Sequence, residues 1–336
     1  HFRLTAGVRY NRERAQREDV SDIRLTLTAP LGLVLDSLPV PLPPALAEQL
    51  AALPVGVPLP QPVANVLSDA LPDLVPRSYS SSGRSRYIDL LPKLGITWLI
   101  DEHNSLGLSY QEGYRSGGTS VSFFRGRVSP FEPEYTRTVE LAGRSSWLDE
   151  RLDLNANLFY TRWRDQQVTI GESSGFESTT ENAGRSHYYG AEVELLWKVG
   201  GPLETFATLG LIRSEFDEFV NGGEDYAGNR FPYAPEHTGA LGLTLREWHR
   251  VSGQVSANYI GSLYSDADND PQSRADSRVL VNAKIGYRLP AGFSLSVYGR
   301  NLGDDVNEQG RLVAGSRTAA RYGEPRSYGL VLEWQS

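Results

Sequence analysis

Apolar and polar residues alternate along most of this chain with a period of two. Because successive side chains of a β-strand point to opposite faces, the pattern predicts strands that are apolar on one face only. Segment 152–160 is the clearest case, with Phe159 as its one exception. The alternation recurs over segments 94–100, 105–111, 135–141, 191–197, 203–211, 239–245, 251–259, 278–288, 293–297 and 326–334. Within segment 278–288, Leu280 is out of register.

The connections between these segments alternate in length. Short turns fall at 101–104, 149–150, 200–202, 247–249 and 290–292. Long polar loops fall at 116–132, 171–183, 220–236, 265–276 and 302–324. Short turns on one rim and long loops on the other are typical of an up-and-down barrel whose two ends face different compartments. We therefore predict an all-β, antiparallel transmembrane β-barrel segment of about twelve strands with long external loops and short periplasmic turns.

In such a barrel the apolar parity of each strand faces lipid and the polar parity faces the lumen. The residues expected to face lipid are Leu152, Leu154, Leu158, Val279, Val281, Ile285, Leu330 and Leu332. The polar residues expected to face the lumen are Glu140, Asp153, Asn155, Asn157, Glu192 and Glu194.

The composition of the chain excludes several kinds of site and argues against several classes of protein. The chain has no cysteine, which excludes disulfides, a thiol nucleophile and zinc–thiolate sites. No apolar run is long enough for a transmembrane helix, and a net charge of -8 without basic runs argues against a nucleic-acid partner. A propeller would repeat a four-strand blade motif, which is not found. A soluble β-sandwich stays possible, although so many strands in up-and-down order would leave exposed edges.

Segment 29–82 breaks the alternation and is rich in Leu, Ala and Pro. Its eleven prolines are incompatible with a central strand or one long helix. Two short helices fit, at about 44–53 and 62–71. The segment lies on the long-loop rim, so we expect an external loop insertion, either a packed loop or a lid over an apolar ligand.

A series of short motifs resembles the TonB-dependent outer-membrane receptor family. Each motif is weak alone, and their order over residues 83–336 makes the resemblance specific. They are Leu91–Gly95, Tyr110–Gly118, Phe131–Glu134 with Thr136 and Glu140, Asn182–Gly184 with Tyr189–Glu192, Pro235–Thr238, Gly299–Leu302 and Glu324–Leu330.

The resemblance implies a barrel of 22 strands whose lumen is closed by an N-terminal plug. Residues 1–336 would then form the C-terminal portion of that barrel, with the plug and the TonB-contacting segment outside this chain. By the same resemblance, the protein would lie in the outer membrane of a Gram-negative bacterium, among lipid and lipopolysaccharide. It would take up a scarce, bulky nutrient through the plug and the inner-membrane TonB complex. An iron chelate such as a ferric siderophore is the expected cargo, and a vitamin or a glycan is the alternative.

One external loop gathers cations and aromatic residues. Arginine offers fixed hydrogen-bond donors and aromatic rings offer flat stacking surfaces, which suits an anionic or aromatic ligand such as a ferric chelate. The candidate ligand-binding residues are Tyr114, Arg115, Phe123, Phe124, Arg125 and Arg127. The alternative is that they serve the lipid rim, with aromatic residues in the interfacial girdle and arginines on lipopolysaccharide phosphates or lumen carboxylates. The ligand would then be bound by the loops at 220–236 or 302–324.

The sequence gives little support for an enzymatic or a metal-binding function. The five histidines are scattered, and no Ser, His and acid residue occur together in a recognisable catalytic motif. We therefore expect that the protein is not an enzyme. The enzymatic alternative is an outer-membrane phospholipase, which is also a barrel. A passive porin or a surface adhesin would use a similar barrel. The loop 266–271 begins like a calcium loop, but Pro271 stands where that loop needs glycine and no bidentate glutamate follows. This favours a solvated acidic turn, and we expect no cofactor and no bound metal.

Overall fold

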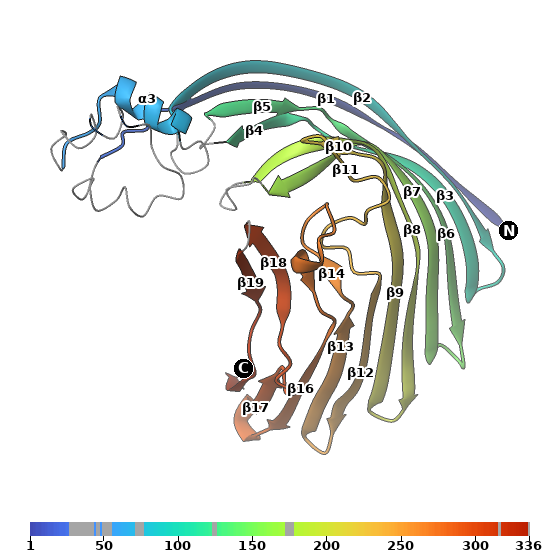
Figure 1. Cartoon of the computed structure of the whole chain (residues 1–336). Coiled ribbons are helices and arrows are strands. Elements are labelled where there is room, and N and C mark those ends of the chain that lie inside the picture. The colour runs from blue at the N-terminus through green and yellow to red at the C-terminus, as the bar shows by residue number, and fades with distance from the viewer. Residues whose placement is uncertain are drawn as a thin grey trace.

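The computed structural model describes residues 1–26, 44, 48, 56–70, 77–122, 126–171, 178–314 and 317–334. Their main feature is one twelve-stranded antiparallel sheet that curves into an open trough, with β1 and β20 as its edges (Figure 1). The strands, in spatial order, are β1 (Phe2–Ser21), β2 (Tyr79–Leu99), β3 (Asn104–Arg115), β6 (Glu134–Trp147), β7 (Leu152–Gly171), β8 (Ser178–Gly200), β9 (Leu203–Glu218), β12 (His237–Trp248), β13 (Val251–Ile260), β16 (Arg278–Arg288), β17 (Phe293–Arg300) and β20 (Ser327–Trp334).

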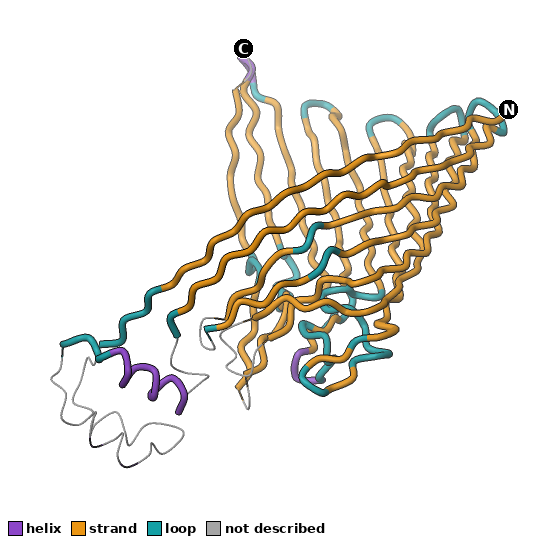
Figure 2. The backbone as a smooth tube through the Cα atoms, turned by 90° about the horizontal axis from the view of Figure 1, so that it is seen from above, coloured by secondary structure: helices purple, strands orange, loops and turns teal. Residues whose placement is uncertain are grey.

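Except for one 3-10 turn, the remaining elements lie in the connections at the long-loop end of the trough (Figure 2). Helix α3 (Gln61–Ala70) lies in the segment between β1 and β2. The short strands pair as hairpins or ribbons, namely β4 (Gly118–Ser122) with β5 (Arg127–Phe131), β10 (Val220–Asn221) with β11 (Glu224–Asp225), β14 (Leu263–Tyr264) with β15 (Arg274–Ala275), and β18 (Glu308–Ala314) with β19 (Arg317–Tyr322). Two single 3-10 turns complete the fold, η1 (Pro271–Ser273) before β15 and η2 (Pro290–Gly292) between β16 and β17.

The predicted meander and all five short turns are confirmed. At the turn between β6 and β7, three successive residues, Leu148, Asp149 and Glu150, have positive φ angles between 55° and 59°. At the turn between β8 and β9, Gly201 has a φ of 55°, a conformation that glycine adopts without steric cost. Because these turns are tight, neighbouring strands end at nearly the same level at this end of the sheet.

The strands at the other end are longer than the alternation predicted. Strand β7 continues to Gly171 and β8 begins at Ser178, so the predicted loop 171–183 is mostly strand. The pairing between β7 and β8 skips Asp165, whose φ of 54° marks a local irregularity, and resumes in the same register at Gln166 opposite Ala183. Beyond this point Val168 and Ala183 are buried against the loop residues Phe231 and Ala267, so the simple alternation of exposed apolar and polar residues ends.

The two faces of the sheet differ as predicted. We call the face that carries Leu158, Ile285 and Leu330 the outer face, and all three of these side chains are exposed, Leu330 to 73%. All eight predicted lipid-facing residues share this parity in the paired strands, and they do not converge on a closed core. We call the opposite face, which carries Asp153, Asn155 and Glu194, the inner face.

Of the two helices expected in segment 29–82, one is confirmed. Helix α3 spans Gln61–Ala70, close to the predicted 62–71. The other, near 44–53, lies almost wholly outside the described residues. Strand β2 begins at Tyr79, before the predicted end of the insertion at residue 82. Among the described residues, no helix has the length and apolarity needed to cross a membrane.

Candidate ligand-binding site

The β4–β5 hairpin folds against neighbouring strands at the long-loop end. The side chain of Asn182 on β8 accepts a hydrogen bond from Glu132 N at 2.7 Å and donates to Asp165 O, also at 2.7 Å. Gln167 on β7 donates from Nε2 to Ser116 O at 2.8 Å, and Ser120 Oγ accepts from Thr180 N at 2.9 Å. The base of the predicted ligand loop is therefore held in a fixed position on β7 and β8.

The structure separates the predicted ligand-binding residues into three groups. Arg115 ends β3 and forms an ion pair with the buried Glu134 at 3.0 Å, so its guanidinium ties β3 to β6. Tyr114 packs between Tyr87 and Tyr135, with ring centroids 6.4 and 5.5 Å away. Arg127 begins β5, is exposed and forms no ion pair with any described residue. Phe123, Phe124 and Arg125 lie outside the described residues.

A cluster of aromatic side chains fills the inner face beside this hairpin. Phe216 is fully buried and lies 4.9 Å from Phe231 and 5.0 Å from Phe219, measured between ring centroids. Trp163 packs against Phe231 at 5.8 Å and against Tyr188 at 5.4 Å. Together with Val168, Ala183 and Ala267, these rings form the largest buried apolar cluster found in the described residues. It joins β7, β8 and β9 to the loop 226–236.

A cavity of about 650 Å³ opens above this cluster. It lies between the loop ends of β7 and β8, the loop residues Phe231–Ala234 and 265–266, and Leu312 of β18. Ligand pockets commonly have volumes of about 300–1,000 Å³ and combine apolar walls with a few polar groups. Here the polar groups include Gln166, Gln167 and Asp266. The cavity can therefore hold a bulky ligand that has both flat apolar and polar parts.

The loops around the cavity hold one another in place. Asn269 accepts from Arg230 N at 2.7 Å and donates to Arg230 O at 3.0 Å, which joins the loop 226–236 to the loop 265–276. Arg311 N donates to Ser265 Oγ at 2.7 Å, which adds β18 to the same assembly. Burial raises the pKa of Asp266 above its usual 3.8, and the neighbouring carboxylates of Asp268 and Asp270 raise it further.

The acidic loop 266–271 forms turns. The Asp268 carboxylate accepts from Asp270 N at 3.0 Å, and the Asp270 carboxylate accepts from Gln272 N at 2.7 Å at the start of η1. In the part of the chain that the structure describes, no three His, Asp or Glu side chains are arranged to hold a metal ion.

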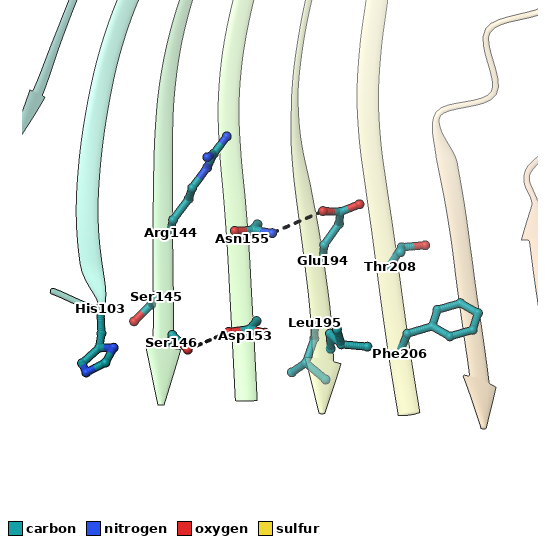
Figure 3. A pocket seen from close by; sticks show the side chains of 11 residues that line it. His103, Arg144, Ser145, Ser146, Asp153, Asn155, Glu194, Leu195, Phe206 and Thr208 are labelled. Atoms are coloured by element: carbon teal, nitrogen blue, oxygen red, sulfur yellow. Dashed lines mark hydrogen bonds between the residues drawn. The ribbon is translucent and has the colours of Figure 1, made fainter. Parts of the chain in front are cut away.

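A second pocket, of about 490 Å³, lies on the inner face toward the short-turn end (Figure 3). Figure 3 shows Arg144, Asn155, Glu194 and Thr208 side by side across four strands. Asn155 donates to Glu194 at 3.4 Å, and Ser146 donates to Asp153 at 2.6 Å in the row below. The predicted lumen residues Asp153, Asn155 and Glu194 thus line one polar wall, and Glu140, Asn157 and Glu192 share its parity.

The aromatic cluster was not predicted as a site. Its members come from segments far apart in sequence, and their meeting depends on the strand register. One signal was available, because Phe216, Phe219, Tyr226, Phe231 and Tyr233 make the stretch around the predicted loop 220–236 unusually rich in aromatic residues. That loop was named only as an alternative place for the ligand.

Comparison with known proteins agrees with this architecture. Residues 1–302 match the family model described as TonB dependent receptor-like, beta-barrel. The pesticin receptor of Yersinia pestis is 25% identical over 256 residues, which cover 75% of this chain and 37% of that protein. The catecholate siderophore receptor Fiu of Escherichia coli K12 is 28% identical over 262 residues, which cover 71% of this chain and 32% of that protein. The chain thus spans about a third of the length of these relatives.

Solved structures show the same fold. The ferric yersiniabactin uptake receptor FyuA from Yersinia pestis matches with a TM-score of 0.65 and 23% identity, over 76% of this chain and 38% of that one. The closed form of the ferric-catecholate import receptor Fiu from E. coli K12 matches with a TM-score of 0.63 and 17% identity, over 98% of this chain and 42% of that one. The twelve-stranded sheet, its lipid-facing outer face and the family match over residues 1–302 lead to one conclusion: this chain belongs to the TonB-dependent receptors of the outer membrane and forms part of their β-barrel domain.

Proposed function

We propose that the protein containing this chain takes up an iron chelate, most simply a ferric siderophore, across the outer membrane. The family consists of ligand-uptake receptors rather than enzymes, and two relatives carry the names of a catecholate siderophore receptor and a ferric yersiniabactin uptake receptor. The observation that carries the proposal is the cavity of about 650 Å³ at the long-loop end, whose lining combines the aromatic residues Phe231 and Tyr233 with polar side chains.

The proposed contacts fall on two sides of this cavity. The rings of Phe231 and Tyr233 would stack on the flat groups of a chelate, and Gln166 and Gln167 would accept or donate hydrogen bonds. The loop with Phe123, Phe124, Arg125 and Arg127 would add cations from the adjacent β4–β5 hairpin. Tyr114 and Arg115 would support that hairpin from below, because Arg115 is engaged with Glu134.

The proposed partners follow from the two ends of the barrel. The polar inner face, with Asp153, Asn155 and Glu194, would contact a plug domain belonging to the same protein. That plug would pass energy from the inner-membrane TonB complex to the ligand site. Residues 1–336 would be the C-terminal portion of the barrel, with segment 29–82 as an external loop insertion. Lipid and lipopolysaccharide would surround the outer face.

Uptake of radioactive iron by cells that express the complete gene would test this function. The host should lack its own siderophore receptors, and a matched strain should lack TonB. We expect accumulation of iron from at least one ferric chelate in the first strain and none in the second. Equal uptake in both strains would indicate a passive porin, and binding to host cells without uptake would indicate an adhesin. TonB-dependent uptake of cobalamin or a glycan, with no uptake of iron, would support the transport function and show that the cargo is not an iron chelate.

A further inference from the structure

The β1–β2 ribbon carries a group of arginines beyond its apolar stretch. The register between the two strands is continuous from Phe2 opposite Trp98 to Ser21 opposite Tyr79. The alternation of faces therefore holds along the whole ribbon. On the outer face, Tyr10 and Leu90 stand opposite each other, and the next rows toward the loop end carry Arg12, Arg14, Arg84 and Arg86.

The length of the apolar stretch fixes the height of these arginines. The outer face of β2 is apolar from Trp98 to Ile88, and these ten residue steps rise about 33 Å along the strand. At a strand tilt of about 40° this corresponds to a height of about 25 Å, which equals the apolar band of an outer-membrane barrel. Aromatic rings mark both ends, with Phe2 stacked on Trp98 at the turn end and Tyr10 at the loop end. Arg12 stands opposite Ile88 in the last row of this band, and Arg14 and Arg86 form the first outer-face row beyond it, at the level of the lipid headgroups.

Among the described residues, these arginines have no partner. All four side chains are exposed, and none makes an ion pair or a hydrogen bond with any residue that the structure describes. Arg14 and Arg86 are direct cross-strand neighbours, and like charges directly opposite each other destabilise a sheet. Of the nearby acids, Glu13 and Asp89 have the parity of the other face. Glu18 shares the outer face but stands opposite Ser82, beyond the arginine rows.

The arginines at the loop end of β6 and β7 are arranged differently. Arg137 is paired with Glu112 at 3.3 Å and Arg164 with Asp165 at 3.4 Å. Both share the outer-face parity of Leu141 and Leu158. Arg162, on the same face of β7, stands opposite Arg137 and donates to the Tyr160 hydroxyl at 3.0 Å. The outer-face arginines of β6 and β7 therefore have partners among the described residues, whereas Arg12, Arg14, Arg84 and Arg86 have none there.

We propose that Arg12, Arg14, Arg84 and Arg86 form a binding site for the phosphates of a lipid headgroup in the outer leaflet. Guanidinium groups form paired, charge-assisted hydrogen bonds to phosphate, and two opposed arginines can share one phosphate between them. The apolar rows below the site would contact the acyl chains of the same lipid. The long-loop end faces the cell exterior, so the occupant is a phosphorylated lipid of the outer leaflet, as in lipopolysaccharide. This site depends on the outer-membrane location and is independent of the cargo.

Binding of diphosphorylated lipid A to the complete receptor, purified in detergent, would test the site by native mass spectrometry. Lipid A without its phosphates serves as the reference ligand. We expect the wild type to prefer the phosphorylated lipid, and the variant R14Q/R86Q to lose at least about tenfold in affinity, the equivalent of one charge-assisted hydrogen bond. The control R137Q/R164Q removes the same charge from the same face and should change the affinity much less.

Three results would overturn the proposal. The wild type could bind both forms of lipid A equally, R14Q/R86Q could keep the wild-type affinity, or both double variants could lose affinity to the same extent. The last result would indicate a general effect of net charge. Circular dichroism would show that the variants are folded. A measurement on the wild type alone gives an independent check, because its preference for the phosphorylated lipid must fall as salt is added.

Discussion

The β1–β2 ribbon and the wall formed by β3, β6, β7 and β8 differ in how their polar and charged side chains are satisfied. In the wall, polar side chains find partners within the chain, as Arg115 does with Glu134 and Asn155 with Glu194. In the ribbon, Arg14 and Arg86 have no described partner, and Leu94 is 55% exposed. The wall is therefore stabilised mainly by its own contacts, whereas the ribbon depends on what surrounds the protein.

The difference arises from the placement of acids. The wall carries Glu112, Glu134 and Asp165 next to its arginines. The ribbon carries Glu13 and Asp89 at odd positions of β1 and β2, and these face away from the outer-face arginines at even positions. Parity along a strand thus decides whether a charge is neutralised by the protein or by its environment.

The largest effect is expected for a charge placed on the lipid face of the ribbon. Leu94 lies near the middle of the apolar stretch of β2, so L94R should lower the free energy of unfolding in a lipid bilayer by about 2–4 kcal/mol. The control T97R puts the same side chain on the inner face of the same strand, where Lys93 is already accommodated. Urea titration of the complete protein in vesicles would measure both. Equal costs would mean that the two faces of the ribbon have been assigned wrongly.

The next effect concerns the ligand at the edge of the wall. If Arg125 and Arg127 contact an anionic ferric chelate, R125A/R127A should weaken binding by about 1.5–3 kcal/mol for each charge-assisted hydrogen bond lost. Folding should be unaffected, because Arg127 is exposed and has no ion pair with the described residues. Isothermal titration of wild type and variant would decide. An unchanged affinity would place these arginines at the lipid rim and leave the cavity beside Phe231 as the ligand site.

A smaller effect is expected inside the wall. Replacing Arg115 with alanine leaves the buried Glu134 carboxylate with one remaining hydrogen bond, from Gln167 N at 2.8 Å. We expect R115A to cost about 1–2 kcal/mol, less than a fully buried pair, because the Arg115 side chain is itself 58% exposed. R127A is the matched control and should cost nothing measurable. A neutral R115A would show that the pair does not stabilise the wall.

The smallest effect is a pH dependence at the cavity. The raised pKa of Asp266 means that its neutral form is favoured in the folded loop, so its stabilising contribution is complete below the ordinary pKa of 3.8. This contribution is lost as pH rises through the raised value. Protonation also removes a negative charge that faces the cavity. The affinity for an anionic chelate should therefore increase as pH falls through this window in the wild type, relative to D266N. Parallel pH profiles for the two proteins would rule out this role.

Strand parity could be predicted from the sequence because lipid and lumen impose opposite preferences on neighbouring residues. Leu158 and Asn157, adjacent on β7, were assigned correctly on this basis. The loop end could not be predicted in the same way. Arg115 pairs with Glu134, 19 residues away, and Trp163 meets Phe231 across strands, and neither contact has a local signature. The strands also lose the alternation near their loop ends, which is why β8, which begins at Ser178, was predicted to begin only after residue 183.

The most direct test of the proposed function is chelate binding to a receptor whose cavity has been filled. Leu312 lines the cavity from β18, and Val306 is exposed on the same connection but does not line it. We predict that L312W weakens the binding of the transported ferric chelate by at least about tenfold, a loss of about 1.4 kcal/mol, whereas V306W leaves it unchanged. Equal affinities of wild type, L312W and V306W would contradict the account and place the ligand elsewhere.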